Sequence, residues 1–224
     1  MRAWPLLTLL LLGACGNITG ADLLRAAIWP VPVPDSLFVR PDIREGEWDP
    51  AEASPPDTEP GLALSLGSRR GVARLVQEEG ERRLWRTPGG VVVATEGPRV
   101  VATAGFREIL ATTRFEGTDP LQQPAEIGPE ALSYTRVVDL MRSGSDPARM
   151  RFGLRLQCRL RPQATESPDI LLLEERCRGA ARFTNRFWAD ASTRAVFRSE
   201  QWVGQDLPPL VIEVVGPPAT SPPR

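Results

Sequence analysis

The sequence of 224 residues contains neither histidine nor lysine. Without histidine it cannot form a Ser-His-Asp triad, a Cys-His pair or a histidine-ligated zinc site. Without lysine it cannot form a Schiff base or supply the phosphate-binding lysine of a P-loop. Metal-ligand spacings, glycine-rich phosphate loops and dinucleotide fingerprints are absent as well, so we expect no metal, no cofactor and no enzymatic activity. Any catalysis would have to use carboxylates, arginine or tyrosine.

The chain also lacks an excess of charge of either sign. Its 27 basic and 28 acidic residues give a net charge of −1. No global basic field therefore exists to hold nucleic acid or anionic lipid, and we expect no nucleic-acid partner. Hydrophobic residues make up 42% of the sequence, which is enough for a sizeable core.

The hydrophobic run at the N-terminus is too short to span a membrane, which takes about 20 apolar residues. One positive charge at Arg2 precedes the Leu-rich residues 5–12, as in a secretory signal peptide. The small residues Gly13 and Ala14 then lead directly to Cys15. This arrangement resembles the lipobox of bacterial lipoproteins; a plain secretory peptide with an incidental cysteine is the alternative.

The lipobox resemblance implies that Cys15 is acylated and becomes the mature N-terminus. At about 0.8 kcal/mol per buried methylene, several acyl chains hold a protein at a membrane practically permanently. Residue 16 is Gly and not Asp, which by the sorting rule familiar from enterobacteria directs a lipoprotein to the outer membrane. We therefore expect a protein anchored by lipid in the outer membrane and facing the periplasm.

Changes in composition divide the chain into four predicted parts. Residues 1–14 are the signal peptide. Residues 15–60 form a lipidated N-terminus with a short helix at 21–28 and a tether whose dense prolines bar regular structure. Residues 61–215 form an antiparallel β domain, and the proline-rich residues 216–224 form a disordered tail.

Short β-prone segments separated by Gly- and Pro-containing turns fill the predicted β domain, a pattern typical of an antiparallel meander. Residues 105–129 are predicted to be mainly loop with some short strands. Because about ten strands cannot stay in one flat open sheet, we expect a mainly β fold, either an antiparallel β-sandwich or a partly open barrel, with a short N-terminal helix. The predicted strands are residues 62–66, 72–77, 82–86, 91–95, 99–103, 134–140, 150–160, 170–178, 181–188, 195–202 and 210–215.

Cysteine is scarce, and lipidation of Cys15 leaves only Cys158 and Cys177. In an oxidising periplasm this even remainder suggests a disulfide. The predicted strands 150–160 and 170–178 flank a turn-rich segment, and a hairpin folded between Ser167 and Pro168 brings the two cysteines opposite each other. A bridge of this loop size stabilises by about 3 kcal/mol in the chain-entropy model. Two buried free thiols are the alternative.

Carboxylates lie near aromatic residues toward the C-terminus. Asp190 and Glu200, with Glu174 and Glu175 further upstream, could flank a sugar in the way that glycosidic cleavage requires. Trp188 and Trp202 could instead stack on sugar rings without catalysis, because the CH groups of a sugar pack on an aromatic face. Charges on exposed strand faces and tryptophans in the core are the ordinary explanation of both patterns.

Arg136 and Asp139 are three residues apart in the predicted strand 134–140. An odd separation places two side chains on opposite faces of a strand. We therefore expect the two residues to have separate partners at the edge of a strand and not to form one ion pair.

Several segments in a fixed order resemble the YjbF/GfcB family of lipoproteins. The segment LWRTPGGV at 84–91 with GPRVVATAGF at 97–106 is similar to the family's Trp-then-GR-x-V-x-T-x-G-L meander. TDPL at 118–121 and RVVD at 136–139 are similar to its DPL and R-x-x-D-W elements, and FTNRFWAD at 183–190 with VFRSEQ at 196–201 to its N-x-Y-W-V-D…V-W-x-S-x-Q signature. Leu140, Phe187 and Phe197 stand where the family has Trp, Tyr and Trp.

The resemblance implies a predominantly antiparallel β lipoprotein that takes part in the secretion of exopolysaccharide or group 4 capsule. It also implies two protein partners, an outer-membrane protein of the YjbH/GfcD type and a periplasmic protein of the GfcC/YjbG type. We expect a noncatalytic accessory protein that binds an export partner or the glycan itself. A glycan-acting hydrolase and an envelope-assembly or lipid-carrier module remain as alternatives. The candidate ligand or partner surface comprises Asp139, Trp188, Asp190, Glu200, Gln201 and Trp202.

Overall fold

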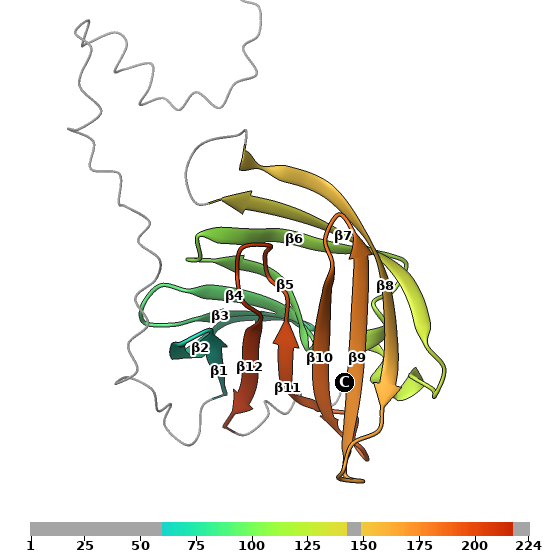
Figure 1. The fold of residues 1–224 in the computed structure, drawn as a ribbon. Coiled ribbons are helices and arrows are strands. Elements are labelled where there is room, and N and C mark those ends of the chain that lie inside the picture. Colours follow the sequence, from blue (N-terminus) through green and yellow to red (C-terminus); the bar gives the residue numbers. More distant parts are fainter. Residues whose placement is uncertain (1–59, 143–148, 217–224) are drawn as a thin grey trace, which may run out of the picture. The chain divides into compact units, whose positions relative to one another are not determined.

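The structure is a computed structural model that describes residues 60–142 and 149–216. Within these ranges twelve antiparallel strands form one continuous sheet (Figure 1). The strands are β1 (Gly61–Leu66), β2 (Arg69–Glu79), β3 (Arg82–Arg86), β4 (Val92–Glu96), β5 (Arg99–Ala104), β6 (Glu108–Glu116), β7 (Leu132–Arg142), β8 (Arg151–Gln163), β9 (Ile170–Gly179), β10 (Phe183–Asp190), β11 (Val196–Gln201) and β12 (Leu210–Val215).

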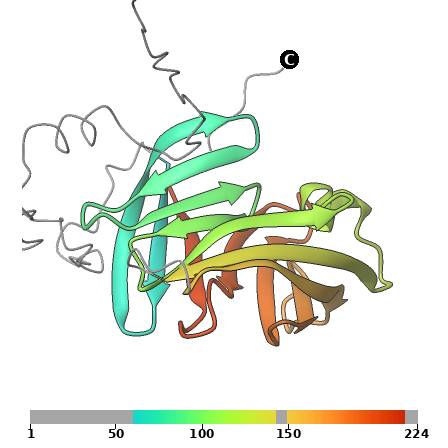
Figure 2. The same cartoon turned by 90° about the horizontal axis from the view of Figure 1, so that it is seen from above.

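The sheet is a meander that almost closes on itself. Its spatial order runs from β5 back to β1, continues through β12, and then descends from β11 to β6. The two edge strands, β5 and β6, are therefore consecutive in sequence. The backbone N–H of Leu110 on β6 donates to the hydroxyl of Thr103 on β5 at 3.0 Å, and the sheet curls until these edges lie side by side (Figures 1 and 2). The result is a nearly closed, barrel-like sheet.

The expectation of a mainly β, antiparallel fold is confirmed, and the partly open barrel describes it better than the sandwich. The predicted helix at residues 21–28 lies outside the described residues. The helical elements that lie wholly within them are two 3-10 turns, η3 (Pro120–Gln122) and η4 (Pro124–Glu126). No helix in these ranges combines the length and the apolarity that crossing a membrane requires.

The strand β6 corrects the prediction of a loop-rich segment at residues 105–129. Its nine residues include two threonines and charged ends, so they show no clean apolar alternation. A bulge between Leu110 and Thr112, where the register with β7 shifts, breaks the period further. The eleven predicted strands are all present, with small differences at their ends.

Alternating side chains from the strands fill the inside of the sheet. One apolar group includes Leu62, Leu64, Val93, Leu156 and Ile212, all buried. A second group joins Leu121 and Ile127, from the segment that contains η3 and η4, to Leu160, Leu173 and Phe187 on β8, β9 and β10. This segment therefore covers one end of the interior over those three strands.

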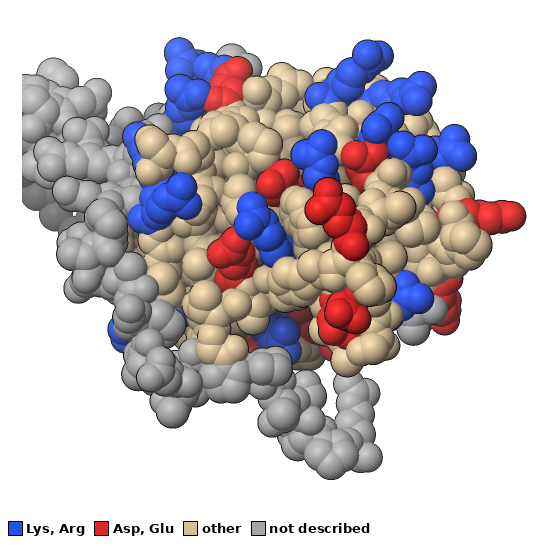
Figure 3. All heavy atoms as spheres, turned by 60° about the horizontal axis from the view of Figure 1, so that its bottom comes forward, with Lys and Arg blue, Asp and Glu red and all other residues tan. Residues whose placement is uncertain are grey.

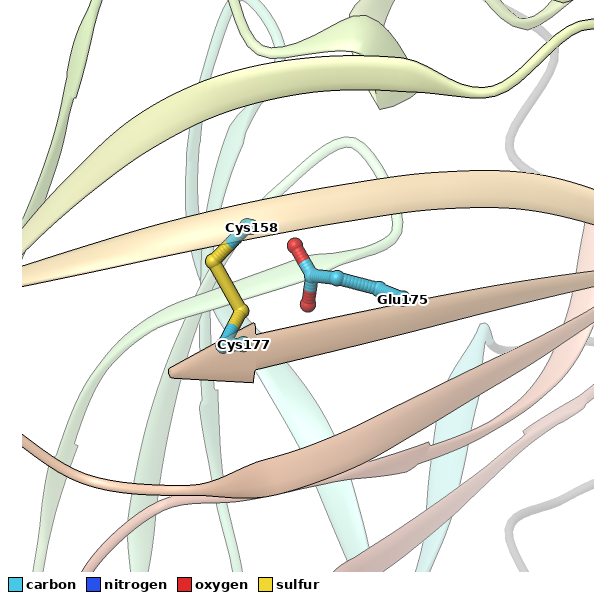
Figure 4. A group of neighbouring side chains, drawn as sticks. All are labelled: Cys158, Glu175 and Cys177. Carbon is cyan, nitrogen blue, oxygen red and sulfur yellow. A yellow bond between two sulfur atoms is a disulfide. The ribbon is translucent and has the colours of Figure 1, made fainter. Parts of the chain in front are cut away.

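The β8–β9 hairpin has the register that the cysteine positions predict. Cys158 lies directly opposite Cys177, and Gln163 lies opposite Leu172, so the hairpin folds between residues 167 and 168. The two cysteines form a disulfide with their Cα atoms 4.1 Å apart (Figure 4). The predicted pairing is thus present, and the alternative of two free thiols does not apply to this structure.

Candidate functional site

Six polar side chains meet inside the barrel-like sheet, where apolar side chains would be the norm. We call them the buried cluster; they come from β5, the cap of η3, β7, β9 and β10. Its two arginines and two carboxylates balance in formal charge. The members are Arg99, Asp119, Tyr134, Arg136, Glu175 and Asn185.

Arg99 lies at the centre of the buried cluster and is fully buried. Its Nε and Nη2 donate to the two carboxylate oxygens of Asp119 at 2.9 and 3.0 Å, and its Nη1 donates to Glu175 at 2.8 Å. The rings of Phe115 and Phe187 each lie 5.2 Å from the guanidinium carbon. Bidentate pairing together with cation–π contacts is the environment that arginine favours over lysine.

Glu175 receives hydrogen bonds from three different strands. Besides Arg99, the hydroxyl of Tyr134 and the amide of Asn185 donate to its carboxylate. Burial alone would raise the pKa of Glu175, but Arg99 and Arg136 together with these donors hold the pKa below its ordinary value. The carboxylate is therefore ionised at neutral pH. Asn185 also accepts the backbone N–H of Trp202 at 2.7 Å, which ties the cluster to the end of β11.

Arg136 is the least satisfied member of the buried cluster. Its Nη2 donates to Thr113 at 3.3 Å and its Nη1 lies 3.9 Å from Glu175, but its Nε and Nη1 make no hydrogen bond. Burial and the neighbouring Arg99 lower the pKa of Arg136 to about 10, so it remains protonated at neutral pH. Arg136 therefore depends on Glu175 for the compensation of its charge.

The buried cluster is built to order the interior, not to meet a large substrate. Arg99 and Glu175 are both 0% exposed, so a polymer cannot reach them. Glu175 also lies beside the disulfide (Figure 4), and its carboxylate and the two sulfurs fall within 4.8 Å of one another. Because the sulfurs of Cys158 and Cys177 are bonded to each other, they offer no thiolate to a metal ion.

The residues of the candidate ligand surface do not share one face. Trp188 and Glu200 lie on the outer side of β10 and β11, where Arg198 stacks 5.2 Å over the Trp188 ring and Arg186 pairs with Glu200 at 3.3 Å. Gln201 and Trp202 are buried. Gln201 accepts the backbone N–H of Val100 at 3.0 Å, and Trp202 stacks on Phe183 with ring centroids 4.4 Å apart. Whether a ligand or partner binds at these positions stays a prediction.

Asp190 and Glu200, the pair considered for hydrolysis, lie apart along the sheet. Glu200 is opposite Arg186, four residues before Asp190 on β10. At about 3.3 Å per residue this is roughly 13 Å, more than the ~5–9.5 Å between the carboxyls of glycosidases. Hydrogen bonds from Ser192 and Thr193 lower the pKa of Asp190 to about 2, the opposite of what a general acid requires. These observations count against the hydrolase alternative.

Arg136 and Asp139 have separate partners, as predicted from their odd spacing. Asp139 accepts from Thr112 at 2.9 Å, from the backbone N–H of Gly153 at 2.7 Å and from Arg114 at 3.1 Å. Arg136, by contrast, points into the buried cluster. The expectation of two charges at the edge of a strand is therefore wrong for Arg136, which is 1% exposed.

The outer face of β8 to β12 carries a network of paired charges. Glu174 contacts Arg176 at 2.8 Å and Arg161 at 3.6 Å, and Arg198 bridges to Glu213 at 2.8 Å. Figure 3 shows a face of the molecule on which acidic and basic side chains are interspersed. Such a surface does not favour a strongly charged ligand of either sign.

An apolar hollow of about 360 Å³ opens at the end of the barrel-like sheet where the described chain begins. Pro60 and Gly61 form part of its wall, with Leu62, Trp85 and Phe197 among the apolar side chains. Phe197 on β11 is 42% exposed although its strand neighbours on the same face are buried. The segment with η3 and η4 thus covers only part of this end.

Sequence reasoning misses most of the buried cluster. From sequence alone Glu175 is a carboxylate near aromatic residues, and neither Arg99 nor Asn185 stands out. One signal was available: Leu173, Glu175 and Cys177 alternate along one strand, so Glu175 occupies an inward-facing position. Its main partner, Arg99, is 76 residues away and could not be assigned from local pattern.

The segments that resemble the YjbF/GfcB family nevertheless supply four of the six members of the buried cluster. Arg99 comes from the GPR segment, Asp119 from TDPL, Arg136 from RVVD and Asn185 from FTNRFWAD. Residues far apart in the sequence thus converge on one structural feature.

Comparisons with known proteins agree with this resemblance. The family model described as group 4 capsule polysaccharide lipoprotein gfcB, YjbF matches residues 59–215. The uncharacterized lipoprotein YjbF of Escherichia coli (strain K12) is 27% identical over 208 residues, 92% of each chain. The crystal structure of the hypothetical lipoprotein YmcC from Escherichia coli (K12) has the same fold, with a TM-score of 0.63 at 17% identity over 90% of this chain and 99% of that one. The chain therefore belongs to the YjbF family of group 4 capsule polysaccharide lipoproteins.

Proposed function

We propose that the protein is a noncatalytic accessory factor in the secretion of exopolysaccharide or capsule, anchored through Cys15 in the outer membrane. The barrel-like domain acts in the periplasm and engages an export partner, of the YjbH/GfcD or GfcC/YjbG type, or the glycan itself. Anchoring keeps the domain at a high effective concentration near its partner, so that a weak contact suffices.

The proposal rests on where the segments that resemble the family lie in the folded domain. These segments supply Arg99, Asp119, Arg136 and Asn185 to the buried cluster, and all four side chains are buried and inaccessible to a polymer. If the residues shared by the family acted on a polymer, the polymer would have to reach them. Residues that only order the interior of the domain do not need to be accessible. The family resemblance therefore supports a shared scaffold, with recognition carried by its surface.

The test is export of polymer in a strain that lacks this gene. Complementation with wild type should restore the amount of secreted polysaccharide, and complementation with Asp190→Asn plus Glu200→Gln should restore it equally. Ser192→Ala, in the same turn as Asp190, serves as a control for local disturbance. Loss of export with the carboxylate double variant, at wild-type protein level, would support the hydrolase instead.

The apolar hollow favours a second candidate, a lipid-carrier or envelope-assembly module. Its lining by Leu62, Trp85 and Phe197 suits an acyl chain more than a sugar. Phe197→Ser should then abolish copurification of lipid, as measured by mass spectrometry of protein extracted from its own envelope. Recovery of no lipid from wild type would remove this candidate.

A further inference from the structure

Four arginines surround a cleft at the other end of the barrel-like sheet. Arg107 lies in the β5–β6 connection, Arg142 ends β7, Arg149 lies two residues before β8, and Arg151 begins β8. We call this the arginine cleft. A hollow of about 710 Å³ and an adjoining one of about 440 Å³ share Arg142, Arg149, Gln205 and Asp206 in their walls. The cleft is thus larger than a single small anion requires.

The arginine cleft has an excess of positive charge, unlike the paired outer face of β8 to β12. Among the described residues that line it, four guanidiniums stand against two carboxylates, those of Glu108 and Asp206. The net charge of these described lining residues is therefore +2. Arginine presents a planar fork of donors that matches a carboxylate or phosphate in a bidentate way.

The two carboxylates position the arginines. Glu108 is 2% exposed and accepts both from Arg151 at 3.2 Å and from the backbone N–H of Asp206 at 3.0 Å. Asp206 pairs with Arg142 through its carboxylate, and its carbonyl accepts from Arg107. The side chains of Arg142 and Arg151 remain 49% and 40% exposed, so their free faces point outward from a buried support.

The β11–β12 loop packs closely on the Glu108 side chain. A Cβ atom on Gly204 would lie 3.1 Å from the Glu108 carboxyl carbon, so a larger residue at this position would require the Glu108 side chain to shift. The β11–β12 loop that holds Gln205 and Asp206 is therefore fitted to Glu108. The arginine cleft is a constructed feature and not a chance gathering of surface charge.

We propose that the arginine cleft binds the carboxylates of an acidic polysaccharide; this rests on the proposed function and names the class of glycan. The two adjoining hollows provide room for more than one sugar unit, and the half-exposed arginines let a chain pass along the surface. Strands β1, β5 and β7 run from the end with Pro60 toward the end with the cleft. The cleft is therefore remote from the point where the predicted lipidated segment joins the domain, which favours a polymer over the anchoring membrane.

The experiment measures binding of the full mature lipoprotein, in detergent micelles, to fragments of polygalacturonate, with neutral dextran of equal length as the second probe. Wild type should bind polygalacturonate in a salt-sensitive way and dextran not at all. Arg107→Gln with Arg149→Gln should weaken binding about tenfold, because two partly exposed charge contacts are removed.

The matched control is Arg159→Gln with Arg178→Gln, which removes the same charge from exposed positions on β8 and β9 outside the cleft. This variant should bind like wild type, and both variants should keep the wild-type midpoint of thermal unfolding.

Three outcomes would overturn the inference. Equal weakening of polygalacturonate binding by both variants would mean that binding depends on the total charge of the protein and not on the cleft. Cleft-dependent binding to phosphatidylglycerol vesicles but not to polygalacturonate would overturn it in favour of a membrane site. Absence of binding to polygalacturonate would also overturn it, while leaving the export test of the proposed function unaffected.

Discussion

At the scale of single residues, the protein places ionised groups where most small β domains place aliphatic ones. Burying two arginines costs desolvation, and the structure offsets that cost with Asp119, Glu175 and Tyr134. A buried pair of this kind is weak evidence for net stability, but the loss of one partner leaves an uncompensated charge. Glu175 is the critical member, because it alone contacts both arginines.

Glu175→Gln should lower the free energy of unfolding by about 3–5 kcal/mol, since Arg99 loses one counter-charge and Arg136 loses the nearest one. Urea denaturation at pH 7 measures this. Glu213→Gln is the control, because that exposed carboxylate pairs with Arg198 on the surface and should change stability by less than about 1 kcal/mol. Equal effects of the two substitutions would contradict the role of the buried cluster.

The difference between wild type and Glu175→Gln should disappear in acid. The folded state depresses the pKa of Glu175, so its contribution is complete above the unfolded pKa of about 4.3 and is lost as the pH falls through the lower folded pKa. Urea denaturation repeated from pH 7 downward should show the two curves converging below about pH 4. A constant difference across that range would mean that the carboxylate charge is not what stabilises the fold.

At the scale of elements, local pattern predicts strands well and fails where a strand is bulged or where inward-facing side chains are charged. The β8–β9 hairpin follows from apolar alternation and the cysteine positions, and its register is confirmed. For residues 105–129 local pattern indicates only short strands within a loop, because the bulge and the threonines of β6 hide the period. Local pattern does not predict the pairing of Arg99 with Glu175, because β5 and β9 are far apart in the sheet order and approach each other only when the sheet curls.

Replacement of both cysteines, Cys158→Ala with Cys177→Ala, should lower the free energy of unfolding by about 3 kcal/mol, as expected for a bridge that spans 19 residues of sequence. The β content seen by circular dichroism should not change, because the register of β8 and β9 is set along their whole length. Wild type under nonreducing conditions should also yield no thiol to alkylating reagents once Cys15 is removed. Two alkylatable thiols would show that the disulfide does not form.

At the scale of the whole molecule, the described fold is one nearly closed sheet with two differently built ends. The apolar hollow lies where the described chain begins, and the arginine cleft lies at the other end. Residues 59–215 carry the family match, whereas the predicted signal peptide, tether and tail lie outside the described residues except for Pro60 and Gly216. The sequence predicts the family from ordered segments, but only the fold shows that these segments bring Arg99, Asp119, Arg136 and Asn185 together in the interior.

The most direct test of the accessory role is a mild crosslink of the native, acylated protein in its own envelope, followed by identification of what is recovered with it. We predict recovery of an outer-membrane or periplasmic component of polymer export, or of the polysaccharide itself. Recovery of neither, from cells that are secreting polymer, would contradict the account.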